Sequence, residues 1–90
     1  MMLYSILIGK ILGDKNSRKL GLIVDIKYPV DTLEGDGDST FLVVRVEHPF
    51  GKEEIVQIKA KFVSKVQDIY VWLSITKKDF MKLTKESPEA

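Results

Sequence analysis

Apolar and polar side chains alternate along several short segments of this chain, and this period of two constrains the fold most strongly. The clearest case is residues 20–28, where the side chains expected on the core face are Leu20, Leu22, Val24, Ile26 and Tyr28. Successive side chains of a β-strand point to opposite faces, so the pattern predicts a strand with one buried face. Similar spacing predicts strands over residues 3–12, 40–47, 54–59 and 69–75, and residues 61–66 predict a tight helical turn.

Composition supports a mostly β fold and limits its size. The chain has 90 residues, with nine each of Ile, Val and Leu but only two Ala, and β-branched side chains suit a pleated surface. It has no cysteine, and no apolar run approaches the roughly 18 to 20 residues that cross a bilayer. We therefore expect one small cytoplasmic domain without a membrane span.

So few residues limit how the strands are arranged. An open sheet of five or six short strands would bury too little apolar area to be stable in so short a chain. We predict a small antiparallel β-barrel over residues 1–76, followed by a short C-terminal helix and tail over residues 77–90. Thr76 and Asp79 have the spacing of a capping box at the start of that helix.

Three segments of the chain resemble the PRC-barrel family. Residues 8–11 and 18–26 are similar to its opening hairpin, in which a Gly-Lys start (Gly9, Lys10) leads to a Leu-Gly-x-Val-x-Asp strand. Residues 40–44 are similar to its third strand, and residues 54–58, 62–66 and 69–73 to its closing segment. The resemblance covers residues 5 to 75, with Lys59 at a position where the family often has proline.

This resemblance implies a fold and a kind of function. It fits the archaeal stand-alone members best and extends to the C-terminal barrel of the bacterial ribosome maturation factor. The family has no shared catalytic residues, and its members work as adaptors or assembly factors on ribosomal RNA and protein, on a membrane complex or on the archaeal division apparatus. The resemblance therefore implies a non-enzymatic binding role.

A surplus of apolar residues is expected on the outside of the barrel. If the alternate residues of three strands, which we expect to be neighbours, fill the core, the side chains left pointing outward are Phe41, Val43, Ile55, Tyr70 and Trp72. Aromatic residues are enriched in the centres of protein interfaces. We predict a surface that binds a protein partner or a second copy of the chain, unless Phe80 and Leu83 of the C-terminal helix cover it.

Basic residues suggest an alternative function. The chain carries 14 basic and 13 acidic side chains, so its net charge of +1 is not that of a dedicated nucleic-acid binder. Two local groups, one near the first hairpin and one near the helical turn, comprise Lys10, Lys15, Arg18, Lys19, Lys59, Lys61 and Lys65. If they lie at one end of the barrel, they would hold an RNA backbone, as in an RNA-processing or ribosome-assembly accessory.

Other sites are not supported by the sequence. The acidic loop with Asp31, Glu34, Asp36 and Asp38 does not match a standard cation loop, so we expect a solvated loop and no metal. His48 is the only histidine and is expected at the surface, without partners for zinc or for a catalytic relay. No general base and nucleophile can be paired, so we expect neither an enzyme nor a cofactor or small-molecule substrate.

Overall fold

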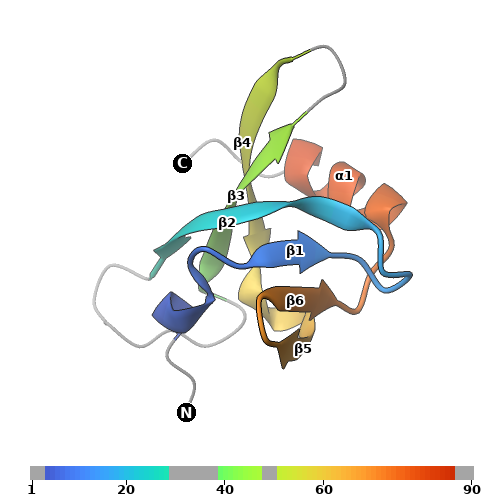
Figure 1. The fold of residues 1–90 in the computed structure, drawn as a ribbon. Coiled ribbons are helices and arrows are strands. Elements are labelled where there is room, and N and C mark those ends of the chain that lie inside the picture. The colour runs from blue at the N-terminus through green and yellow to red at the C-terminus, as the bar shows by residue number, and fades with distance from the viewer. Residues whose placement is uncertain (1–3, 29–38, 48–50, 87–90) are drawn as a thin grey trace.

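The computed structural model describes residues 4–28, 39–47 and 51–86, which form one curled sheet of six strands with one short α-helix (Figure 1). The prediction of a mostly β fold with a short C-terminal helix is confirmed. Along the chain the elements are η1 (Tyr4–Leu7), β1 (Ile11–Gly13), β2 (Lys19–Lys27), β3 (Phe41–Glu47), β4 (Glu53–Lys59), η2 (Ala60–Phe62), β5 (Val63–Gln67), β6 (Tyr70–Leu73) and α1 (Lys77–Glu86).

The strands lie in the order β4-β3-β2-β1-β6-β5. Neighbouring strands are antiparallel except for β1 and β6, which run parallel. The prediction of a wholly antiparallel sheet is therefore wrong at this one pair. Two parallel strands need a long connection between them. Here the connection from β1 to β6 consists of β2, β3, β4, η2 and β5.

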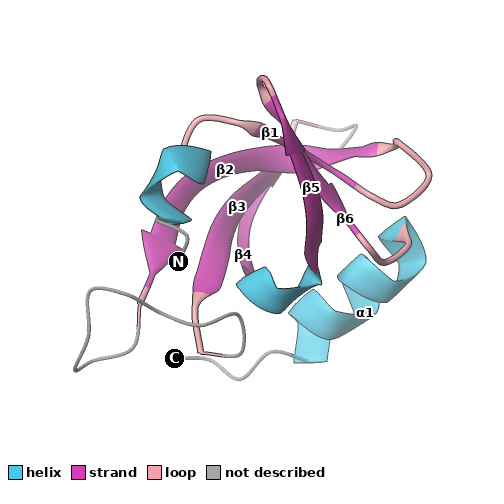
Figure 2. Ribbon diagram, turned by 90° about the horizontal axis from the view of Figure 1, so that it is seen from below, coloured by secondary structure: helices cyan, strands magenta, loops and turns pink. Residues whose placement is uncertain are grey.

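The two edge strands, β4 and β5, are consecutive in the chain and are joined only by the three residues of η2. This short joint requires the sheet to curl until its edges meet at one end, as Figure 2 shows. Backbone hydrogen bonds fix η2 on both sides: Ala60 N–H donates to Thr40 O, and Ser74 N–H donates to Phe62 O. The described residues form no β4–β5 ladder, so η2 joins the two edge strands at one end and closure into the predicted barrel is not confirmed.

The first predicted strand, residues 3–12, is wrong over most of its length. The described part begins with the 3-10 turn η1, and only Ile11–Gly13 form a strand. Gly9 adopts a φ of +91°, a conformation that favours glycine and interrupts an extended segment. This local path buries Leu7 completely and leaves Ile6 and Ile8 exposed.

β2 contains an irregularity that changes which side chains face the core. Ile23 pairs with Val44 and Asp25 pairs with Val43, so Val24 is an extra residue without its own partner on β3. Such a bulge shifts the alternation by one residue. Ile23 is therefore fully buried, whereas Leu22, expected in the core, is only half-buried.

α1 packs against the inner side of the sheet. Phe80 is 1% exposed and belongs to the main core cluster. It lies with Met81 beside Val46 and Val56, whose side chains face inward from β3 and β4. The predicted helix start is confirmed in part, because Asp79 N–H donates to Thr76 Oγ1 over 3.1 Å.

Asp14 joins the β1–β2 turn to the beginning of α1. Its side chain is buried and accepts three backbone N–H groups: those of Asn16 and Arg18 at 2.8 Å on Oδ1, and that of Lys77 at 2.9 Å on Oδ2. Burial alone would raise the pKa of Asp14, but the three N–H donors and the charge of Arg18 outweigh it and lower the pKa below the ordinary aspartate value.

Because the pKa of Asp14 is lower in the folded state than in the unfolded state, its contribution to stability is complete above about pH 4 and is lost as the pH falls through the folded-state pKa. We expect Asp14→Ala to lower the free energy of unfolding by about 3 kcal/mol at pH 7, because it removes three hydrogen bonds to a charged group. Urea unfolding measured from pH 7 to pH 2 checks both effects.

The matched control is Asp68→Asn, because Asp68 is exposed and its φ of 53° suits asparagine. This variant is expected to keep the acid dependence of the natural chain, whereas Asp14→Asn is expected to weaken it. If the free energy of unfolding falls equally with pH in the natural chain and in Asp14→Asn, Asp14 is not the group responsible.

Candidate functional site

A row of side chains crosses the outer face of the sheet from β4 to β6. Each member lies directly opposite the next in the strand register. We call this set the outer row; in order, its members are Ile55, Arg45, Leu22, Ile11 and Tyr70. Directly opposed residues on one face of a sheet have Cβ atoms within about 5.5 Å of each other, so these side chains form a continuous surface.

The outer row faces away from the core. The residues next to its members along the strands include Val44, Ile23, Leu12 and Val71, all with no exposed surface. Adjacent residues of a strand point to opposite faces, so the members of the row point outward. At its two ends Ile55 is 59% exposed and Tyr70 is 39% exposed, and the members between them are half-buried.

The five apolar residues predicted to form one outer patch are divided between two places. Phe41, Val43 and Ile55 lie on the neighbouring strands β3 and β4, whereas Tyr70 and Trp72 lie on β6. The expectation that all three strands are neighbours is wrong, because β2 and β1 separate β3 from β6.

Leu22 and Ile11 connect the two places, and sequence reasoning missed both. Leu22 was expected in the core because the bulge at Val24 is not visible in the alternation pattern. Ile11 was hidden inside a longer predicted strand. Arg45 lies between Ile55 and Leu22 because of the strand register, which the sequence does not specify.

The C-terminal helix does not act as the predicted cover of this face. Phe80 is buried beside Val46 and Val56 on the inner side of the sheet, and Leu83 packs against the same core. Ile55, on the outer side of β4, keeps most of its surface exposed. The sequence allowed either an exposed outer face or one covered by the C-terminal helix. For the outer row, the structure agrees with the exposed face.

Trp72 is held in place by its neighbours on β6 and β1. Its ring stacks on Tyr70, with the ring centroids 5.2 Å apart and the ring planes 8° from parallel. In the parallel ladder Trp72 lies opposite Gly13. A Cβ atom added at Gly13 would come within 2.5 Å of ring atoms of Trp72, so glycine is what allows the indole to lie over β1.

We therefore expect Gly13→Ala to displace the Trp72 ring and to lower the free energy of unfolding by about 1–3 kcal/mol, because the added methyl overpacks the contact. Chemical unfolding followed by tryptophan fluorescence measures both changes, since Trp72 is the only tryptophan in the chain. In a Trp72→Leu background, Gly13→Ala is expected to lower the free energy of unfolding by less than it does in the natural chain. An equal loss in both backgrounds would show that the added methyl does not act through Trp72.

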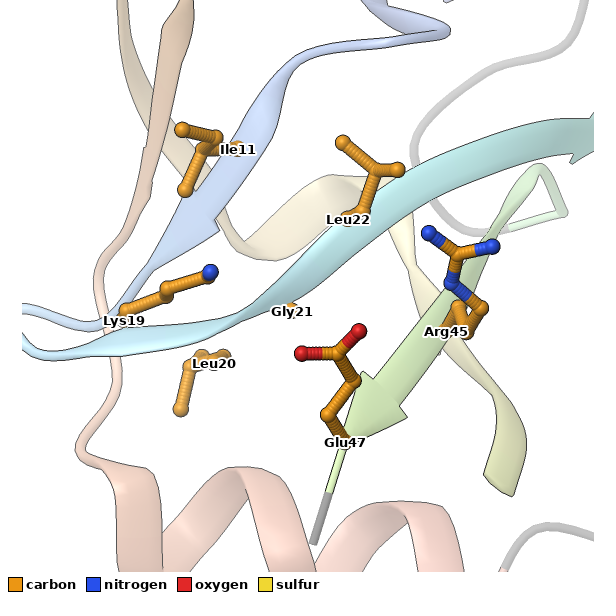
Figure 3. A pocket seen from close by; sticks show the side chains of 7 residues that line it. All are labelled: Ile11, Lys19, Leu20, Gly21, Leu22, Arg45 and Glu47. Atoms are coloured by element: carbon orange, nitrogen blue, oxygen red, sulfur yellow. The ribbon is translucent and has the colours of Figure 1, made fainter. Parts of the chain in front are cut away.

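A shallow pocket of about 340 Å³ opens at the middle of the outer row. Figure 3 shows the charged ends of Lys19, Glu47 and Arg45 arranged around Gly21, with Ile11 and Leu22 beside them. Arg45 Nε is buried and has no hydrogen-bond partner among the described residues. The pocket thus combines two cations, one carboxylate and three aliphatic side chains, those of Ile11, Leu20 and Leu22.

The seven predicted basic residues lie in three places rather than two. Lys10 lies just before β1, and its ammonium group donates to the backbone carbonyl of Asp68 in the β5–β6 turn. Around and after the end of β1 lie Lys15, Arg18 and Lys19, with Lys65 opposite Trp72 on β5. Lys59 and Lys61 lie at the end of β4 and in η2, where Lys61 is 5.4 Å from the ring centroid of Phe62.

Within residues 4–28, 39–47 and 51–86, no three His, Cys, Asp or Glu side chains come together as a metal site. The acidic loop and His48 lie outside these described residues. Neither of the described 3-10 turns nor α1 is long and apolar enough to span a membrane.

No protein-family model and no curated protein matches the chain. The PRC-barrel resemblance accordingly stays a prediction that rests on the segments quoted for it. Function is therefore argued from the outer row, the pocket at its middle and the surroundings of Trp72.

Proposed function

We propose that this protein is a non-enzymatic cytoplasmic binding module, an adaptor or assembly factor that docks a protein partner across the outer row. The observation that carries the proposal is the continuity of the row, which runs over five strands and keeps Ile55 and Tyr70 exposed at its ends. Single exposed apolar side chains are ordinary on a protein surface, but a connected set of them marks an interaction site.

The composition of the surface suits a protein interface. Tyr, Trp and Arg are the residue types that most often dominate binding energy, and here Tyr70, Trp72 and Arg45 lie on one face. Trp72 is already oriented by Tyr70 and Gly13, so binding would require little further ordering of its side chain. Ile11 and Leu22 supply the apolar contact between these anchors.

Charge indicates the chemistry of the partner. Arg45 lies within the row, and Lys19 lines the pocket at its middle together with a single carboxylate, that of Glu47. On β1, β6 and β5 the outward residues include Lys65 but no carboxylate. A partner surface that carries apolar side chains with one or two carboxylates complements this arrangement, and it would give Arg45 an acceptor.

We expect Ile55→Lys to abolish the binding of such a partner while changing the free energy of unfolding by no more than about 0.5 kcal/mol, because the side chain is mostly exposed. The matched control is Ile6→Lys, since Ile6 has the same 59% exposure but lies outside the row. Quantitative co-purification from native cells, followed by affinity measurement with the captured protein, compares the three chains.

A protein that is retained by the natural chain and by Ile6→Lys but lost by Ile55→Lys agrees with the proposal. Equal retention by all three chains contradicts it. Solution mass measured on the same samples identifies a second copy of the chain as the partner if the mass of the natural chain doubles and Ile55→Lys restores the mass of one chain.

The alternative function, an RNA-processing or ribosome-assembly accessory, has one observation in its favour. Two of the predicted basic residues, Lys15 and Lys65, line a cleft together with Trp72. In the sequence Lys15 lies 50 positions before Lys65 and 57 before Trp72, so only the fold brings Lys15 to this ring.

A further inference from the structure

A cleft of about 360 Å³ lies between the β1–β2 turn and the β5–β6 hairpin. We call it the Trp72 cleft. The residues of its lining that carry the inference are Lys15, Ser17, Ser64, Lys65, Trp72 and Ser74. The Trp72 cleft is distinct from the pocket at the middle of the outer row, because the two share no lining residue.

The polar groups of the Trp72 cleft are donors of the kind that hold phosphate and sugar oxygens. Lys15 and Lys65 supply two ammonium groups, and three serines supply hydroxyls. Asp14 is the one carboxylate in the lining, against two ammonium groups, and it already accepts three backbone N–H groups. The cationic groups therefore dominate the face that a ligand would meet.

Trp72 provides a flat apolar ring beside these donors. It is half-buried, stacked on Tyr70 and supported by Gly13, so its orientation is fixed before any ligand binds. A nucleic-acid base stacks on an aromatic ring of this kind while its backbone is held by neighbouring cations. On one side of Trp72, Lys65 lies directly opposite it in the β5–β6 ladder. On the other side Gly13 of β1 lies opposite Trp72, and Gly13 in turn pairs with Lys19 of β2.

The geometry points to a binding site for single-stranded nucleic acid in the Trp72 cleft, with one base stacked on Trp72 and the adjoining phosphates on Lys15 and Lys65. A duplex does not offer a base face to the protein, so the strand must be single. The contacts involve π-faces and phosphates rather than base edges, so binding tolerates different sequences. This inference rests on the nucleic-acid alternative. It shares Trp72 and the stacking partner Tyr70 with the proposed protein interface, but the Trp72 cleft includes none of Ile55, Arg45, Leu22 and Ile11.

The test uses the full chain with labelled oligouridylate and oligothymidylate of equal length, followed by fluorescence anisotropy at several salt concentrations. Binding of both single strands is expected to weaken as salt rises, and an unlabelled duplex is expected to compete poorly. The intrinsic fluorescence of the only tryptophan is expected to fall on binding, which reports base stacking without any substitution.

Lys65→Gln is expected to reduce the slope of log affinity against log salt by about 0.7, because one phosphate contact is lost. The charge-matched control is Lys82→Gln, since Lys82 is exposed on α1, lies outside the cleft and is not one of the seven predicted basic residues. Trp72→Leu is expected to weaken binding about tenfold. If Trp72→Leu fails to fold, Lys65→Gln and the tryptophan quenching still decide the question.

Three results would overturn the inference: no salt-dependent binding in the micromolar range, equal losses in Lys65→Gln and Lys82→Gln, or displacement of the oligonucleotide by polyglutamate at an equal concentration of charge. The last result would identify the ligand as an acidic peptide. Ile55→Lys is expected to bind oligonucleotide like the natural chain, so failure of this site and failure of the outer row remain distinguishable.

Discussion

The sheet depends on β1, a strand of only three residues that connects its two halves. On one side β1 pairs with the β2–β3–β4 meander, and on the other it pairs with β6 of the β5–β6 hairpin. Each of its residues has a different environment. Leu12 is fully buried in the core, Ile11 points outward in the outer row, and Gly13 accommodates the ring of Trp72. Asp14 follows at once and fixes the turn to α1.

The mostly β class, several strands and the start of the helix were predictable from the sequence because apolar alternation and turn residues are local signals. They predicted the strands around residues 20–28, 40–47 and 54–59, and Thr76 as the start of the helix. The parallel β1–β6 pair and the bulge at Val24 were not predictable, since both depend on contacts between distant segments. The same two features decide that Leu22 and Ile11 belong to the outer face.

The candidate site was predictable as residue types but not as an arrangement. The outward direction of Tyr70 and Trp72 follows from alternation around the buried Val71. Their separation from Phe41 and Val43 follows only from the strand order. Lys15 is distant from Trp72 in the sequence, yet the fold places both in one cleft, where strand pairing sets Lys65 opposite Trp72. One face of the sheet thus presents an apolar row suited to a protein, next to a cleft whose ring and cations suit a nucleic acid, and both depend on β1.

The central claim is that a partner docks across the outer row. Backbone amide NMR spectra of the natural chain, recorded while the captured partner protein is added, test it most directly. We predict that the largest chemical-shift changes fall on Ile11, Leu22, Arg45, Ile55 and Tyr70, with small changes in α1. Changes concentrated in α1 and on the inner side of β4, with the amides of the outer row unaffected, would contradict it.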